Sequence, residues 1–278
     1  MAEFHVRTTG TATGNGSSTN PWNLQTALNH PASVLPGDTI WLHGGVYAGA
    51  FTSTLQGTAL APIKVRSYPE EWAILDNAGQ NSVALWVAAP RYVWFWGFEI
   101  RNSGLTPNRD ESGVNFGSSE GMKLINLVVH DQGSTALNPW SAATNAEIYG
   151  CAVYYCGRFE DVNHKNGYGI YGQNTLPSRK TIEETFFFNM FSIFPVHYGG
   201  SAASDEDNTA FIGNTIFGHT LYDGKNVIAI HGQFESGIPP ESTGGPRSGS
   251  SRRMPSAIQQ FLERGHPMMR DHPGAETR

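Results

Sequence analysis

Three side chains that can carry protons recur at matching places in short strand-like runs of the chain. Tyr171 lies in GIYGQ, His197 in PVHYG and His231 in AIHGQ, each directly after an aliphatic residue. Histidine titrates near neutral pH, and both histidine and tyrosine serve as general acids and bases. In a strand the aliphatic residue would point inward and the next side chain outward. We therefore predict an outward catalytic column with His197 as base and Tyr171 as acid; the alternative is a structural ladder of stacked rings.

Further polar residues are predicted to bind a substrate beside this column. They come from the equivalent run SGVNFGS, from positions that flank the column, and from the long segment 157–167, which would form a positive patch. An ordinary solvated loop is the alternative for that segment. The predicted substrate-binding residues are Asn115, Arg158, His164, Lys165, Gln173, Tyr198, Gln233 and His130.

His130 stands on a different predicted strand, where it aligns with Arg101 and Tyr154. The adjacent Asp131 is not expected to pair with it, because neighbours on a strand point to opposite faces. His130 could line a groove or belong to a surface ladder, and both interpretations stay open.

Internal repeats indicate the architecture that positions these residues. WGFEIRN (96–102), INLVVHD (125–131), YGCAVYY (149–155), EETFFFN (183–189) and IGNTIFG (212–218) fall into one register, with starts 29, 24, 34 and 29 residues apart. Their aligned central positions are Ile100, Val129, Val153, Phe187 and Ile216. Strand-rich repeats of 20 to 50 residues are typical of solenoids. We therefore predict an all-β fold, a parallel β-helix of about seven coils.

A second strand is predicted after each of these runs. SGVNFGS (112–118), YGIYGQN (168–174), FPVHYGG (194–200) and IAIHGQF (228–234) align with one another. This alignment places Val114, Ile170, Val196 and Ile230 inward. A slip of one residue would reverse the faces.

Two stretches resemble a known family. PGDTIWLHGGVYAGAF (36–51), followed by GTALAPIKVRSYP (57–69), resembles the opening coil of right-handed parallel β-helix proteins, including polysaccharide lyases of the chondroitinase-B and alginate-lyase type. NGYGIYGQN (166–174) and PVHYGG (195–200) resemble motifs of secreted β-helix repeat proteins. The resemblance covers roughly residues 20–234 and implies a right-handed, pectin-lyase-like fold. It also implies a helix that caps the first coil, for which WNLQTALNH (22–30) is suited because three of its apolar residues share one face.

The resemblance also implies a function and a location. It points to a secreted or periplasmic protein that acts on an acidic polysaccharide by β-elimination of a uronate. The alternatives are a glycoside hydrolase on the same scaffold and a non-catalytic protein for polysaccharide binding or adhesion. Calcium is the one cofactor that the resemblance implies. The acidic run 205–208 offers oxygen ligands of the kind that calcium prefers, but it matches no known calcium loop and a solvated turn is the favoured interpretation. No metal ligand is assigned.

Composition excludes several classes of protein. Only 15% of the 278 residues are charged, the net charge is −6, and no long apolar run occurs. These values argue against general nucleic-acid binding and against a membrane-spanning helix. Cys151 and Cys156 are expected to be small core residues.

Three segments are expected along the chain. Residues 1–19 form an N-terminal arm that begins with residues typical of a cloning site and contains no signal peptide. Residues 20–235 form the β-helix. Residues 236–278 form a Gly/Pro/Arg-rich tail with one short helix, and this tail is a candidate non-native extension.

Overall fold

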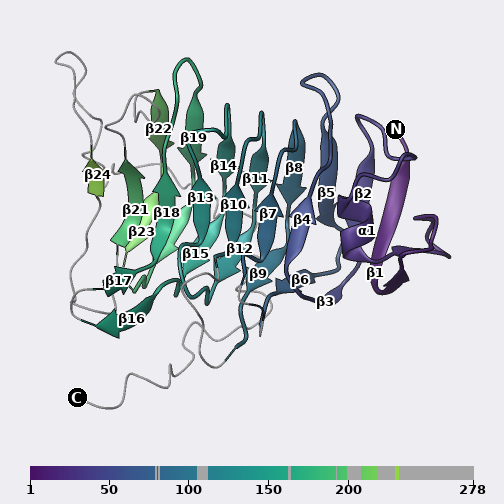
Figure 1. Cartoon of the computed structure of the whole chain (residues 1–278), viewed down its shortest axis with the longest axis horizontal. Coiled ribbons are helices and arrows are strands. Elements are labelled where there is room, and N and C mark those ends of the chain that lie inside the picture. The colour runs from purple at the N-terminus through teal and green to yellow at the C-terminus, as the bar shows by residue number, and fades with distance from the viewer. Residues whose placement is uncertain are drawn as a thin grey trace.

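Short strands rich in β-branched and aromatic residues wind into successive coils. The computed structural model describes residues 1–78, 80, 82–104, 112–161, 164–191, 193–198, 208–217 and 229–231, with the backbone alone for 159–161, 164–166, 193–198, 217 and 229–231. In each coil the chain passes through three parallel sheets in turn, and the coils stack side by side along the long axis of the molecule (Figure 1). The fold is the predicted right-handed parallel β-helix.

The three sheets are numbered here in the order in which the chain visits them. Sheet 1 contains β1 (Glu3–Thr11), β2 (Thr39–Leu42), β5 (Ile63–Ser67), β8 (Val93–Trp96), β11 (Lys123–Ile125), β14 (Glu147–Tyr149), β19 (Lys180–Glu183) and β22 (Thr209–Ile212). Sheet 2 contains β3 (Gly45–Ala48), β6 (Ala73–Asp76), β9 (Glu99–Arg101), β12 (Val128–His130), β15 (Ala152–Tyr154), β20 (Phe186–Phe188) and β23 (Thr215–Phe217). Sheet 3 contains β4 (Phe51–Ser53), β7 (Leu85–Val87), β10 (Val114–Phe116), β13 (Leu137–Pro139), β18 (Tyr168–Gly172), β21 (Ile193–Tyr198) and β24 (Ala229–His231).

The register predicted for sheet 2 is confirmed. Val129 pairs with both Ile100 and Val153, and Phe187 pairs with both Val153 and Ile216. The first four of these residues, in chain order, are fully buried. Stacked aliphatic and aromatic side chains of this kind form the interior of the solenoid, because each coil buries its apolar side against its neighbours.

A single residue with positive φ marks the turn from sheet 1 to sheet 2 in five successive coils. These residues are Gly97, Asn126, Gly150, Glu184 and Gly213, with φ between 48° and 73°. Glycine and asparagine adopt this left-handed conformation at low cost. The turn has the same length in each of these coils, so it fixes how the strands of sheet 2 follow those of sheet 1.

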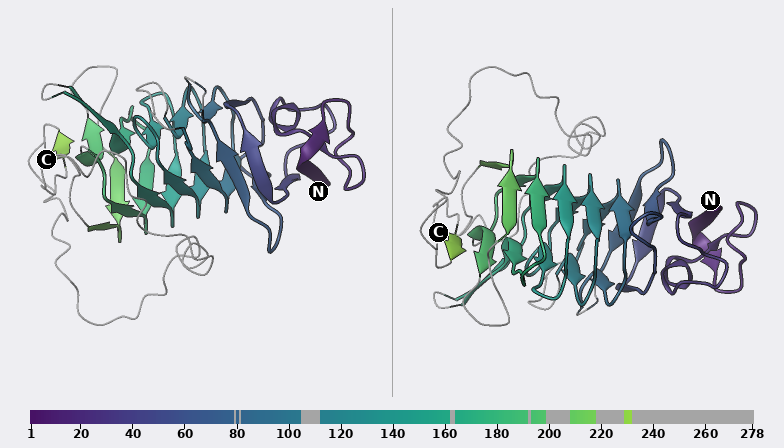
Figure 2. Two further views of the ribbon diagram at one scale, coloured as in Figure 1. Left: turned by 90° about the horizontal axis from the view of Figure 1, so that it is seen from below. Right: turned by 90° about the horizontal axis from the view of Figure 1, so that it is seen from above.

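The N-terminal end of the solenoid is covered as predicted. Helix α1 (Leu24–Leu28) buries Leu24, Ala27 and Leu28, and the side chain of Asn23 accepts a hydrogen bond from the amide of Thr26 at 2.9 Å. The segment expected to be an arm contains β1, which pairs in parallel with β2 and begins sheet 1. Figure 2 shows these elements together at the N-terminal end of the stack.

The two cysteines of the chain lie in the core. Cys151 and Cys156 are free and fully buried, as expected, and burial raises the pKa of both thiols.

The segment 157–167, expected as a loop, contains an antiparallel hairpin of β16 (Arg158–Asp161) and β17 (His164–Asn166). No helix among the described residues has the length and apolar character needed to cross a membrane. The tail 236–278 lies outside the described residues.

Candidate functional site

A groove of about 510 Å³ lies on the outer face of sheet 3. Strand alternation explains its lining, because inward Leu85, Val114 and Leu137 are fully buried and the residue after each faces the other way. Those outward residues stand in one row across three coils, where Asn115 pairs with Trp86 and with Asn138. The full lining is Ser82, Val83, Trp86, Ser112, Asn115, Ser134, Thr135, Asn138, Trp140, Tyr168 and Tyr171.

Aromatic rings and an amide form the centre of the groove. The Trp140 indole N–H donates a hydrogen bond to Oδ1 of Asn115, which fixes the ring above the sheet. The ring centroid of Tyr171 lies 5.5 Å from that of Trp140 and 5.6 Å from that of Tyr168. Trp86 and Trp140 remain 39% and 37% exposed. Exposed aromatic faces beside amide groups suit a flat ligand that has both apolar faces and hydroxyl groups.

A buried lysine supports this groove from beneath. Lys180 is 1% exposed, and its Nζ donates to the carbonyl oxygen of Trp140 at 2.6 Å and to that of Gln173. Burial lowers the pKa of Lys180 to about 7. These bonds link the chain just after β13 to the chain just after β18, and the sequence alone predicts no role for this lysine.

The prediction that Tyr171, His197 and His231 align across adjacent strands is wrong. Tyr171 pairs with Val196, whereas His197 pairs with Gly172 and with Ile230, and His231 pairs with Tyr198. Tyr171, His197 and His231 therefore stand in three different rows of sheet 3. The alternating pattern allowed a one-residue slip, and the connections into sheet 3 differ in length from coil to coil, so spacing could not fix the register.

Some of the predicted site residues line the groove and others do not. Asn115, predicted to bind substrate, and Tyr171, predicted to be the acid, both line the groove, and Ile170 next to Tyr171 is fully buried as predicted. Gln173 follows β18 and lies outside the described lining. Asn138 and Tyr168 were missed, although the polar residue inside TALNP (135–139) repeats the pattern of SGVNF.

The remaining predicted residues are placed by backbone or lie beyond the described part. Arg158, His164 and Lys165 belong to the hairpin that precedes β18, where Arg158 pairs with Asn166. The side chains of His164, Lys165, His197, Tyr198 and His231 lie outside the described part of the chain, as does Gln233 entirely. Their catalytic and binding roles stay predictions.

A second cluster of polar residues lies on the outer face of sheet 2. His130 pairs with Arg101 and Tyr154, as predicted. Its Nε2 lies 3.1 Å from Oε1 of Glu99, and its Nδ1 lies 2.8 Å from Oδ2 of Asp131. The rings of His130 and Tyr154 stack with centroids 4.7 Å apart. With both nitrogens bonded and one face covered, His130 has the contacts of a structural residue.

The expectation that His130 and Asp131 do not pair is wrong. Asp131 has a φ of 55°, so the strand ends at His130 and the carboxylate turns back toward the ring. Alternation across a strand applies only while the backbone stays extended.

Charge pairing sets the ionisation of this cluster. Burial by itself raises the pKa of Glu99, but hydrogen bonds from His130 and Trp72 and the nearby Arg101 lower it below the ordinary value. Burial also disfavours a charged imidazole, yet the bonds to Asp131 and Glu99 raise the pKa of His130. The two carboxylates thus favour the imidazolium form of His130.

In the described part of the chain, no group of three or more His, Cys, Asp or Glu side chains is arranged to hold a metal ion. Residues 205–207 of the acidic run lie outside that part.

Comparisons with known proteins identify the fold. No family model and no curated protein sequence matches the chain. Among solved structures, a rhamnogalacturonan lyase is similar over 82% of this chain and 60% of its own, with a TM-score of 0.61 and 15% identity. An alginate lyase from Paenibacillus sp. str. FPU-7 is similar over 82% of this chain and 80% of its own, with a TM-score of 0.55 and 20% identity.

A third structure extends this range of named activities. GH136 lacto-N-biosidase from Eubacterium ramulus is similar over 81% of this chain and 57% of its own, with a TM-score of 0.53 and 16% identity. The chain thus spans less than two thirds of the length of two of these three proteins. At these identities the likeness establishes that the chain has the parallel β-helix fold of these proteins.

Proposed function

We propose that the protein is a carbohydrate-active β-helix that holds a polysaccharide in the groove of sheet 3. The observation that carries this proposal is the row of Trp86, Asn115 and Asn138 with Trp140 and Tyr171 beside it. Sugar rings present apolar faces that stack on aromatic side chains, and their hydroxyl groups bond to amides. The row crosses the strands, so the polysaccharide lies along the axis of the helix.

The reaction that we propose is β-elimination of a uronate polymer. This reaction needs a base for the proton at C5, an acid for the departing oxygen and a cation for the carboxylate. Tyr171 lies in the groove and can supply a proton. His197, one coil further, is the proposed base; its backbone pairs with the residue after Tyr171, in the neighbouring row. Arg158 and Lys165, on the hairpin before β18, are the proposed cations.

Polysaccharide binding without catalysis is the second candidate. One observation favours it: the described residues that line the groove carry no Lys, Arg, His, Asp or Glu side chain. Such a lining can orient a sugar, but its strongest proton donors are the phenols of Tyr168 and Tyr171.

One set of assays separates these candidates. Uronate polymers and neutral polymers are incubated with the protein, and binding, ultraviolet absorbance and reducing ends are followed. Absorbance from an unsaturated uronate supports elimination, whereas reducing ends without absorbance would indicate hydrolysis. Binding without either product would indicate a non-catalytic protein. A protein that binds no polysaccharide in the panel would overturn the proposal.

Trp86 provides the structural test of the groove. Trp86→Ala should weaken polysaccharide binding about tenfold, because the exposed ring is lost as a stacking platform. Tyr149→Ala is the matched control, since Tyr149 is a similarly exposed aromatic residue on sheet 1 at 42% exposure. Equal effects of the two substitutions would show that the groove is not the binding site.

His197 tests the catalytic step. His197→Ala should reduce the elimination rate by roughly two orders of magnitude or more, in line with general base catalysis. Binding and the melting temperature should stay close to those of the unmodified protein. Full activity in this variant would remove His197 from the mechanism.

A further inference from the structure

Basic and aromatic side chains alternate on the outer face of sheet 1 near its N-terminal end. Arg66 pairs with Trp41 on one side and Trp96 on the other, and Lys64 pairs with Trp94 in the neighbouring row. All five side chains are partly exposed. They come from three adjacent strands, β2, β5 and β8, and we call them the basic–aromatic surface.

The geometry leaves the charged groups available for a ligand. The guanidinium carbon of Arg66 lies 4.0 Å from the ring centroid of Trp96 and 5.0 Å from that of Trp41. Stacking occupies the faces of the guanidinium plane, while its N–H donors point outward within that plane. Two parallel donors of this kind match the two oxygens of a carboxylate. Lys64 Nζ lies 6.0 Å above the ring centroid of Trp94 and adds a second charge.

These two cations lack acidic partners among the described residues. Nearby basic groups do have such partners: Lys123 lies 2.6 Å from Glu147, and Arg91 lies 3.3 Å from Glu120. Lys64 and Arg66 form no ion pair in the described part of the chain. Arg66 is partly buried between the two indoles, and this partial burial lowers the pKa of its guanidinium. A partly desolvated cation without a carboxylate gains more from an anionic ligand than a fully hydrated one.

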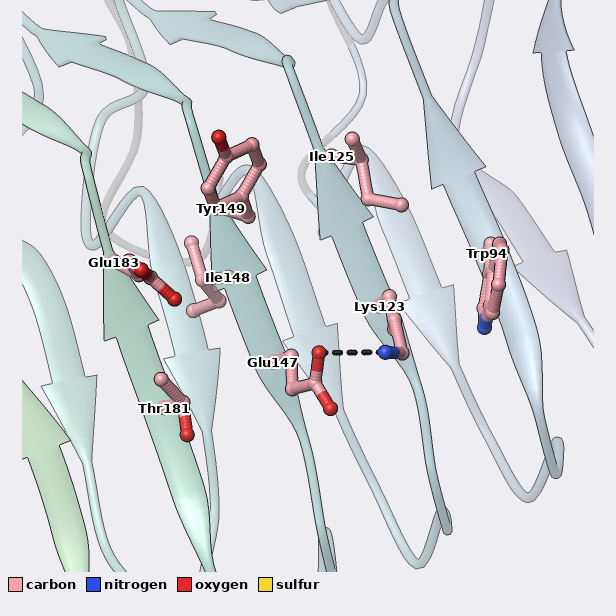
Figure 3. Close-up of a pocket in the computed structure, with 8 residues that line it drawn as sticks. All are labelled: Trp94, Lys123, Ile125, Glu147, Ile148, Tyr149, Thr181 and Glu183. Atoms are coloured by element: carbon pink, nitrogen blue, oxygen red, sulfur yellow. Dashed lines mark hydrogen bonds and ion pairs between the residues drawn. The ribbon is translucent and has the colours of Figure 1, made fainter. Parts of the chain in front are cut away.

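The same sheet becomes acidic toward the C-terminal coils. Figure 3 shows a cavity next to the basic–aromatic surface, where the dashed contact joins Lys123 to Glu147 and where Glu183 lies one strand further. This cavity has a volume of about 220 Å³. Its carboxylates would repel an anionic ligand, so the favourable path runs from β8 toward β2.

We propose that the basic–aromatic surface binds carboxylate groups of an acidic polysaccharide, at a second site apart from the groove of sheet 3. Arg66 binds one carboxylate through the N–H groups at the edge of its guanidinium. Lys64 attracts the carboxylate of the next uronate unit along the polymer. The indoles hold both cations in place and present apolar edges to the sugar rings. The proposal rests on the proposed function in taking a polysaccharide as ligand. It adds a second binding site, which would keep the polymer attached to the protein while another part of it occupies the groove of sheet 3.

The test uses the full chain and polygalacturonate as probe. A Lys64→Gln, Arg66→Gln double variant should bind polygalacturonate at least about tenfold more weakly, and the dependence of its affinity on salt should be shallower. An Arg91→Gln, Arg179→Gln double variant has the same net charge and should change affinity less than about twofold, since surface charges away from the site act weakly. Binding of a neutral polymer should be unchanged in both. The melting temperature of each variant is measured alongside.

Additional variants make the result decisive. Arg66→Lys keeps the charge but loses the paired donors, so it should show part of the loss even if the double variant folds poorly. The same tenfold loss should appear in a Trp86→Ala background, which separates this site from the groove. If Trp86→Ala has no effect, the groove proposal fails while this one stands.

Three results would overturn the inference. The double variant could bind polygalacturonate as well as the unmodified protein does. It could lose a neutral polymer to the same extent. Sulfated dextran or DNA could bind through Lys64 and Arg66 while polygalacturonate does not, which would show that carboxylates are not the ligand.

Discussion

Glu99 illustrates what one buried carboxylate does in the cluster on sheet 2. It is 1% exposed and accepts a hydrogen bond from the Trp72 indole at 2.7 Å, in addition to its pairing with His130. Glu99→Gln keeps the shape but removes the charge that holds the imidazolium. We expect the free energy of unfolding to fall by about 3 kcal/mol, because removing one partner of a buried ion pair is strongly destabilising, and His130 then keeps only Asp131 as a charged partner. Urea denaturation measures this change.

An exposed ion pair supplies the comparison. Glu147→Gln removes the partner of Lys123 on sheet 1, where the side chains are 48% and 30% exposed. Solvent screens this pair, so the change should stay below about 1 kcal/mol. Equal losses in the two variants would show that Glu99 is not part of a desolvated cluster.

The same cluster predicts how stability depends on pH. The pKa of His130 is raised above 6.5, so its stabilisation is complete below pH 6.5 and is lost as the pH rises through the raised value. The pKa of Glu99 is lowered below 4.5, so its stabilisation is present above pH 4.5 and is lost as the pH falls. The difference in unfolding free energy between the unmodified protein and His130→Gln should therefore be largest between these two pH values. A difference that does not vary with pH would contradict this assignment.

Between one strand and the next, the turn with positive φ is the element that sets the register. Gly97 occupies such a turn with φ of 73°, and a Cβ added there would meet no atom within 4 Å. Gly97→Ala should therefore lower the free energy of unfolding by about 1 kcal/mol through backbone strain alone. Glu184 occupies the equivalent turn with φ of 48°, so Glu184→Gly should be neutral or stabilising. Thermal unfolding of both variants checks this, and the opposite order of stability would show that the turns are not strained.

These turns also explain which part of the fold could be predicted from the sequence. From β8 onward the connection from sheet 1 to sheet 2 has a constant length, so aligned runs gave the pairs of Val129 and Phe187 correctly. The connection into sheet 3 varies and in one coil contains the hairpin β16–β17. Its register therefore depends on tertiary packing, and the alignment of His197 with Tyr171 failed by one residue.

In the candidate site, too, some residues could be predicted from the sequence pattern, whereas others depend on tertiary packing. Asn115 and Tyr171 were found because alternation around a buried neighbour is visible in the sequence. Lys180 could not be found, because its two partners are backbone carbonyl groups, which carry no signal in the sequence. The bond between His130 and Asp131 depends on one backbone angle that the residue types do not dictate.

For the whole molecule, stacking makes each coil depend mainly on its neighbours. Leu28 in α1 is 1% exposed and covers the first coil, where the Thr54 amide donates to its carbonyl at 3.0 Å. Leu28→Ala should cost about 2–5 kcal/mol locally. In a solenoid this loss stays near the cap. Amide hydrogen exchange should therefore quicken in β1, β2 and β4 and stay unchanged in β14 and β19. Uniform acceleration through the chain would show a single cooperative unit instead.

The row formed by Trp86, Asn115 and Asn138 has a consequence for how such a protein could change over time. Each coil contributes one position to this row, at a spacing of about 4.8 Å. Duplication of one coil would lengthen the row by one position, about the span of a single sugar ring, without disturbing the positions already there. The number of coils would then set the length of glycan that the groove can bind. Gain or loss of whole repeats would change that length in discrete steps.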